Sequence, residues 1–191
     1  MQANRLIASE LNALNSQMHS LAESMTPDDW TRRNVPGTNL PAFSFWHIAR
    51  VIDSTVNLAL RGAPQVIASE PFASKAWARP GIGTGFSRQE ADELAAQVVP
   101  EEALAYADAV RAQVNQWLRG LAEEELDAPA RLLDRVRTAP GYANAEILET
   151  ISEFDGQPVW LVLSLACFAH GWAHLEEIRL LVGVERAAAA G

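Results

Sequence analysis

The sequence predicts an all-α protein, a four-helix bundle with short extra helices and long crossover loops. Apolar residues recur at helical spacing in four long segments, the sequence has no strand-like alternation, and the connecting segments are long enough to cross an end of a bundle. Of its 191 residues, 49% are hydrophobic and 20% are charged, a balance typical of a folded globular protein. We expect one domain over residues 1–186, followed by a short Ala-rich tail at 187–191.

The first half of the chain contains two of the four long helices. The first is expected over residues 5–25, where Ile7, Leu11, Leu14, Met18, Leu21 and Met25 form a single apolar stripe. Thr26 and Pro27 can then cap and start a short helical turn. The second helix is expected to be capped by Asn39 and to run to about Leu60, stopping near Gly62.

The second half supplies the other two long helices. Residues 63–86 are rich in proline and glycine, which predicts irregular backbone, and Ser87 and Glu90 fit a capping box that opens a short helix to about residue 98. A third long helix is expected over 100–121. Secondary structure is hardest to predict for residues 127–157, where we expect a short strand or helix around 147–154. The last helix is expected from Pro158 to about 182, ending at Gly183, at the centre of the domain because it is apolar on nearly every side.

Charge and composition exclude several functional classes. The formal net charge is −9, which repels phosphate backbones, so we expect no nucleic-acid partner. The most apolar stretch, residues 158–169, is shorter than the roughly 20 residues of a membrane span, and the N-terminal residues do not resemble a secretory signal. A single cysteine, Cys167, suits a reducing compartment. We therefore expect a cytoplasmic protein without a membrane partner.

Two of the four histidines, His170 and His174, stand four residues apart. Because a helix turns by about 100° per residue, the two imidazoles share one face and could bind one metal ion. The same spacing also suits two core histidines satisfied by hydrogen bonds. A metal site needs a third ligand, and His47 is the candidate because it lies at the edge of the apolar face of the second helix. Taken alone, His47 is better explained as an interfacial residue with one nitrogen in water, and His19 is expected in solvent.

Other polar residues can be placed around these histidines by spacing. Glu177 shares the face of His170 and His174 and could orient an imidazole or move a proton, or could pair with an arginine instead. Arg50 and Ser54 lie one and two turns past His47, where they could meet a carboxylate or hydroxyl of a substrate, although Arg50 is equally consistent with a solvated charge.

Two further features have simpler interpretations. Cys167 is expected to be a core residue rather than a nucleophile. The run Gly81–Gly85 follows no strand and lacks the Lys-Ser/Thr ending of a phosphate loop, so we interpret it as a mobile loop near a pocket mouth.

The segment Phe45–Asp53 around His47, together with His170-x-x-x-His174 followed by Glu177-Ile178-Arg179, resembles the DinB/YfiT-like superfamily of metal-binding four-helix bundles. The likeness covers nearly the whole chain in helix order and ligand placement. It implies that His47, His170 and His174 bind a divalent metal ion, either zinc, nickel or iron. It also implies a low-molecular-weight thiol cosubstrate, as in relatives that use bacillithiol, mycothiol or glutathione, and a homodimer. It carries over no catalytic residue.

These observations predict a metal-dependent enzyme, a thiol-dependent transferase or isomerase that acts on a small electrophilic molecule. Two alternatives stay open: a noncatalytic metal-dependent binding or stress-response protein, and a metal-dependent hydrolase. Three histidine ligands do not indicate which of these functions is correct, because a metal ion activates a bound water in the same way as it activates a thiol.

Overall fold

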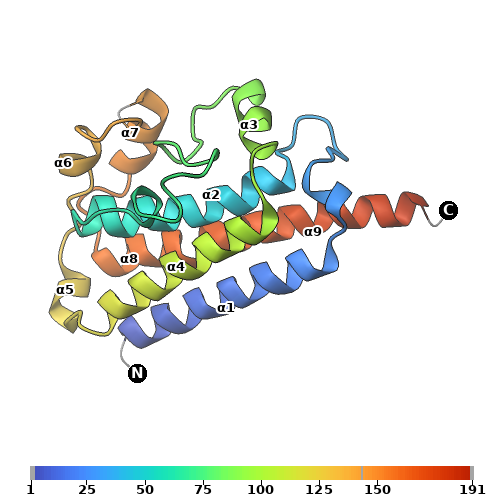
Figure 1. Ribbon diagram of the computed structural model, residues 1–191. Coiled ribbons are helices and arrows are strands. Elements are labelled where there is room, and N and C mark those ends of the chain that lie inside the picture. Colours follow the sequence, from blue (N-terminus) through green and yellow to red (C-terminus); the bar gives the residue numbers. More distant parts are fainter. Residues whose placement is uncertain (1–2, 143, 190–191) are drawn as a thin grey trace.

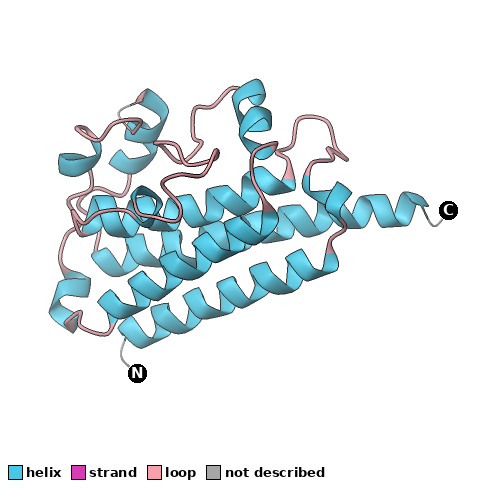
Figure 2. Ribbon diagram, in the orientation of Figure 1, coloured by secondary structure: helices cyan, strands magenta, loops and turns pink. Residues whose placement is uncertain are grey.

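The computed structural model describes residues 3–142 and 144–189 and confirms the all-α helical bundle (Figures 1 and 2). Four long helical segments lie side by side: α1 (Ala3–Ser24), α2 (Pro41–Asp53), α4 (Pro100–Leu118) and α9 (His170–Ala189). Helix α2 continues without a break into η2 (Ser54–Leu60), and α9 is preceded by α8 (Val159–Ser164) and η4 (Leu165–Ala169). Both η2 and η4 are π-helical. Within the described residues there is no β-strand, and an isolated antiparallel bridge joins Pro129 and Pro158.

Short helices close the bundle. They are η1 (Pro27–Trp30), η3 (Val66–Ala68), α3 (Arg88–Ala95), α5 (Glu123–Asp127), α6 (Leu133–Val136) and α7 (Ala145–Ser152). The capping box expected at Ser87 is present, with Glu90 as the reciprocal acid, and the cap expected at Thr26 is also a capping box, with Asp29 as its acid. In Figure 1, α6 and α7 lie against the outer side of the α2–η2 segment. The segment of unclear sequence pattern therefore forms a helical cover rather than a strand.

The core lies around α2. In the apolar stripe of α1, Ile7, Leu11, Leu14, Met18 and Leu21 are buried, and α1 packs against α4 and the last helix. Twelve of the thirteen residues of α2 are buried, Val51 being the exception. The sequence predicts the final helix at the centre, and here the structure corrects it. The final segment keeps exposed side chains such as Trp160, because it is covered on fewer sides than α2.

Several helix boundaries differ from the prediction: the helix expected over 100–121, for example, ends at Leu118. Two of the differences have a clear physical reason. Helix α2 begins at Pro41 after Leu40, and Asn39 does not cap it but accepts a hydrogen bond from Arg88 at 2.8 Å. The last helix does not end at Gly183 but continues to Ala189, because Gly183 does not take the left-handed conformation that ends helices and alanine is a strong helix former. Part of the expected tail, 187–189, is thus helical, and residues 190–191 lie outside the described residues.

None of the helices in the described residues combines the length and the apolar character that a membrane crossing requires. The stretch at 158–169 is helical, as expected, but only in part buried: Val162, Leu163, Ala166 and Cys167 are buried, whereas Trp160 is exposed.

Candidate metal centre

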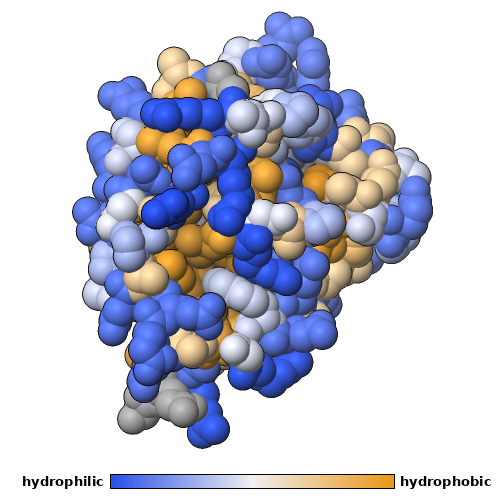
Figure 3. Space-filling view, turned by 90° about the vertical axis from the view of Figure 1, so that its left-hand side faces the viewer, coloured by the Kyte–Doolittle hydropathy of each residue, from blue (hydrophilic) through white to orange (hydrophobic). Residues whose placement is uncertain are grey.

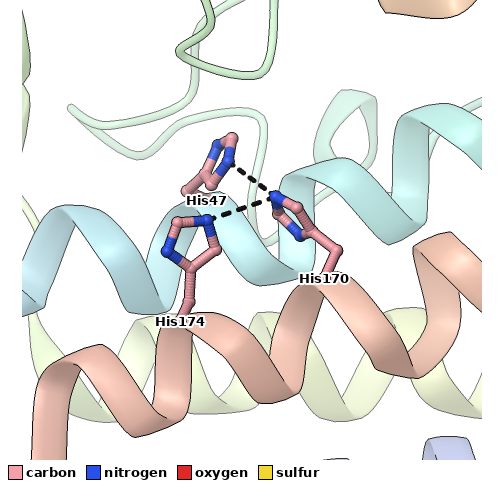
Figure 4. A group of neighbouring side chains, drawn as sticks. All are labelled: His47, His170 and His174. Atoms are coloured by element: carbon pink, nitrogen blue, oxygen red, sulfur yellow. Dashed lines mark hydrogen bonds between the residues drawn. The ribbon is translucent and has the colours of Figure 1, made fainter.

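Three histidine side chains converge between α2 and the start of α9 (Figure 4). The Nε2 atoms of His47 and His170 are 3.1 Å apart, and those of His174 and His170 are 3.2 Å apart. Each ring offers a nitrogen within 4.8 Å of the others. The structure thus brings together the three histidines that the sequence singles out, from two helices separated by more than a hundred residues.

The position of His47 follows from the burial of α2. Its ring stacks on Phe43, with centroids 5.7 Å apart, and only 8% of the residue is exposed. Its Nδ1 atom donates a hydrogen bond to the carbonyl oxygen of Ile82, in the glycine-rich segment that crosses over α2. Because the proton sits on Nδ1, the lone pair of Nε2 points toward His170.

His174 is oriented in the same way by a different group. Its Nδ1 atom lies 3.0 Å from Oε2 of Glu177, one helical turn further along α9. A carboxylate can only accept, so Nδ1 carries the proton and Nε2 presents its lone pair. This is the arrangement in which an outer carboxylate fixes the tautomer of a metal-binding histidine.

The remaining ring, His170, cannot satisfy both neighbours. One hydrogen on its Nε2 atom can be donated to His47 or to His174 but not to both, and its buried Nδ1 atom has no partner among the described residues. A metal ion satisfies all three Nε2 lone pairs at once. Nitrogens bound tetrahedrally to zinc at about 2.0–2.1 Å would lie roughly 3.4 Å apart, close to the observed separations. The donor set therefore fits a divalent ion.

Burial keeps two of the rings neutral. Removal from water lowers the pKa of His47 from 6.5 to about 4, helped by the nearby His174 and opposed by the bond to Ile82. Removal from water also lowers the pKa of His170 to about 3, with the other two histidines adding to the effect. Neutral imidazole is the form that binds metal ions, so protons do not compete for these nitrogens near pH 7.

A second buried polar cluster surrounds Arg50, one turn beyond His47 on α2. The Nε and Nη2 atoms of Arg50 donate to the carbonyl of Gly81 at 3.2 and 2.9 Å, and Nη1 donates to Asp53 and to the Tyr106 hydroxyl at 3.2 and 2.9 Å. A further bond joins Nη2 to the Tyr142 hydroxyl. Arg50 is completely buried and uses all five of its N–H donors. It is neither a solvated charge nor available to a substrate carboxylate.

The carboxylate of Asp53 completes this second cluster. It accepts hydrogen bonds from the backbone N–H groups of Val66 and Ile67 at 3.0 and 3.1 Å, and from the hydroxyl of Tyr106 at 2.6 Å. The cluster therefore ties η3 to α2 and α4. Its members are buried polar groups with their hydrogen bonds made inside the protein.

The glycine-rich segment is packed rather than loose. Gly81 and Gly141 both have positive φ, and a Cβ atom on Gly141 would come within 2.4 Å of Pro80. This close approach needs glycine and brings the 80–85 segment against the one that carries Tyr142. In contrast to the expected mobile loop, successive carbonyls of this segment bind Arg50 and His47.

A cavity of about 250 Å³ extends from His47 and His170. Its walls are α2 and η2 on one side, α8 and η4 on another, and Ile82, α6 and α7 as the cover. Both π-helical segments line it, which agrees with the frequent placement of such segments at functional sites. Figure 3 looks at the end of the molecule that carries α5, α6 and α7, where apolar surface is exposed between polar side chains.

Other residues named from the sequence have distinct places. Ser54 lines the cavity, and its hydroxyl lies 3.5 Å from the carbonyl of Val51. Cys167 is fully buried in the main core, which raises the pKa of its thiol to about 12 and agrees with a core role. His19 lies away from the cluster and pairs with Asp108 at 3.2 Å, with its side chain 37% exposed.

Sequence reasoning missed several participants. The Ile82 carbonyl, Tyr106 and Tyr142 were not identified, because a backbone acceptor has no side-chain signature and the tyrosines lie 56 and 92 residues from Arg50. The glycines at 81 and 141 were the available signal, since positions of close backbone approach favour glycine.

The comparisons with known proteins agree with this geometry. The family model of the DinB superfamily matches residues 10–178, which include all three histidines. No curated protein matches the chain. A solved structure described as the conserved protein of locus from Enterococcus faecalis is 18% identical, covers 96% of this chain and 99% of that chain, and has a TM-score of 0.65, which shows a shared fold. The family match shows that this chain belongs to the DinB superfamily.

Proposed function

We propose that His47, His170 and His174 bind one divalent metal ion. The observation that carries this proposal is the convergence of three Nε2 lone pairs on a point that no single proton can satisfy. The outer groups support it, because Ile82 and Glu177 hold two of the rings in the tautomer that leaves Nε2 free. Imidazole ligands suit zinc, nickel and iron alike.

We further propose a thiol-dependent transferase or isomerase that acts on a small electrophilic molecule. A divalent ion with three histidine ligands retains a position for a further ligand and lowers the pKa of a thiol or water bound there. The cavity reaches His47 and His170, so a molecule held in it would have one end at the metal centre. The low-molecular-weight thiol is the cosubstrate in this proposal.

The cavity walls favour thiol transfer over hydrolysis. Among the described residues that line the cavity, the titratable groups are His47, His170 and Tyr142, and the Tyr142 hydroxyl already bonds to Arg50 and Gln65. Hydrolysis commonly requires a separate acid or base to move protons, whereas a thiol with a lowered pKa is already a nucleophile. The walls therefore suit a reaction in which the chain supplies position and exclusion of water.

Turnover by metal-loaded protein tests the proposal. Protein loaded in turn with zinc, nickel or iron would be mixed with glutathione, bacillithiol or mycothiol and a small chloronitrobenzene, and loss of free thiol would be followed. We expect acceleration that His47→Ala abolishes and His19→Ala retains. Equal rates with and without protein would reject the enzyme, and turnover without thiol would indicate a hydrolase. Metal and ligand binding without any turnover would indicate a binding protein.

A further inference from the structure

The cavity beside the histidines has walls without charge. Among the described residues that line it there is no Lys, Arg, Asp or Glu. Apolar side chains such as Val51, Leu58, Val136, Phe154 and Val162 form most of the surface. A charged group enclosed by such walls would lose its hydration without gaining a partner, which strongly disfavours its binding.

Two of the hydroxyl groups in the walls are already hydrogen-bonded inside the protein. Tyr142 accepts from Arg50 and donates to Gln65 at 2.7 Å. Thr150 donates to the carbonyl of Glu146 at 3.0 Å. The hydroxyl groups of Ser54, Thr55 and Thr84 also line the cavity and can each make hydrogen bonds, but they cannot neutralise a charged molecule.

The nearest cation is also unavailable. Arg50 lies one turn from His47, but it is not part of the cavity wall and each of its N–H donors has an acceptor inside the protein. Its charge is compensated by Asp53 in the same cluster, with neither side chain exposed. A carboxylate or phosphate in the cavity would thus find no arginine fork to bind.

The volume limits the size of the occupant. An apolar cavity of about 150 Å³ in another protein holds benzene. The cavity of about 250 Å³ found here has room for one aromatic ring with small substituents, or an aliphatic molecule of similar bulk.

We propose that this cavity binds a neutral, predominantly apolar molecule of about the size of a substituted benzene, with one end at His47 and His170. The statement that this molecule is the electrophilic substrate rests on the proposed function. The preference for a neutral over an anionic ligand rests on the cavity walls alone.

A matched ester and acid test the preference. Methyl 4-chloro-3-nitrobenzoate and 4-chloro-3-nitrobenzoate share a skeleton and differ in charge, and both would be titrated calorimetrically into zinc-loaded and chelator-treated protein. In the chelator-treated protein we expect the ester to bind at least about tenfold more tightly, because the carboxylate of the acid would lose its hydration without gaining a partner. In the zinc-loaded protein the ion can bind that carboxylate, so there the two affinities report on the metal as well as on the cavity walls. Equal or tighter binding of the acid by the chelator-treated protein would overturn the inference.

Variants locate the binding. Ala166→Phe fills the cavity and should abolish ester binding. Because a buried substitution can impair folding, an exposed position provides a second test: Thr150→Arg adds a positive charge to the wall and should narrow the ester-to-acid ratio. Ser152→Arg, on the same helix outside the lining, should leave the ratio unchanged. If the two arginine variants behave alike, the ligand does not occupy this cavity.

The outcome separates the two proposals. Selective ester binding without thiol-dependent turnover would support this inference and remove the proposed enzyme. Thiol-dependent turnover together with equal or tighter binding of the acid to the chelator-treated protein would support the enzyme and overturn the inference.

Discussion

Two polar clusters lie one helical turn apart on α2, and they differ in how completely their hydrogen bonds are made. Around Arg50, each N–H donor finds an acceptor, and Asp53 accepts from side chains and backbone of three segments. Around His170, two lone pairs compete for one hydrogen, and a buried nitrogen has no partner among the described residues.

The difference separates a structural role from a binding role. A buried polar cluster whose bonds are complete holds the fold in one arrangement and leaves nothing for a ligand. A buried polar cluster whose groups cannot all find hydrogen-bond partners within the protein is suited to bind an ion or a ligand. The following variants test whether the two clusters divide stability and binding in this way.

The largest expected effect is on metal content. His47→Ala removes one of the three proposed ligands, so the affinity for the metal ion should fall by more than the roughly 10–100-fold that loss of an outer partner costs. Elemental analysis of the purified variant should find far less than the one ion per chain expected of the parent. His19→Ala is the control, since His19 pairs with Asp108 away from the cluster, and it should keep its metal. Equal metal content in both variants would show that the ion does not bind here.

The Arg50 cluster should instead control folding. Arg50→Met leaves Asp53 buried without its cation, and loss of one partner of a buried pair typically costs about 3–5 kcal/mol. Urea unfolding should show this loss. Arg32→Met, which breaks an exposed ion pair with Asp28, should cost less than about 1 kcal/mol. A small effect at position 50 would mean that the second cluster does not stabilise the fold.

The histidine cluster should make the metal-free protein sensitive to acid. The pKa of His47 falls from 6.5 to about 4 on folding, and that of His170 to about 3, so the unfolded chain binds more protons below pH 6.5. The free energy of unfolding should therefore decrease by a few kcal/mol between about pH 6.5 and pH 3. Urea unfolding at several pH values would measure this slope. His47→Gln should be less pH-dependent than the parent, and an unchanged slope would contradict the assignment.

The smallest expected effect concerns the outer carboxylate. Glu177→Ala removes the acceptor of His174 and should weaken metal binding by about 10–100-fold without abolishing it. The neighbouring Glu176 pairs with Arg179 on the surface, so Glu176→Ala provides a matched control. Competition with a metal-binding dye would compare the two, and similar affinities would mean that Glu177 does not support the site.

The long helices could be predicted because their apolar residues repeat once per turn. The stripe from Ile7 to Leu21 and the capping box at Ser87 each encode their own local structure. The π-helical segments were not predicted, because a π-helical turn contains one extra residue but has no distinctive amino-acid composition. The secondary structure of residues 127–157 could not be predicted from a pattern of apolar residues. Their short helices place apolar side chains such as Val136 and Ile151 around a cavity, which does not require a regular helical repeat.

The three histidines of the candidate site could be predicted from the sequence, but their surroundings could not. His170 and His174 are related by local helical spacing, and His47 stands out because it lies at the edge of the apolar face of its helix in a chain with four histidines. The environment of Arg50 depends on Tyr106 and Tyr142, which are distant in sequence and reach it through tertiary packing. Spacing along one helix can show which way Arg50 faces, but it cannot show that the facing surface is already occupied.

The adjacent carbonyls of Gly81 and Ile82 give the two clusters a shared backbone segment. An ion that favours one tautomer of His47 also strengthens the hold on this segment, and a segment held in place by Arg50 prepares the imidazole for the ion. By thermodynamic linkage, occupancy of the centre and resistance of residues 80–85 to proteolysis should rise together. Two consecutive carbonyl groups would thus link the binding of an ion at the histidines to the local order of residues 80–85.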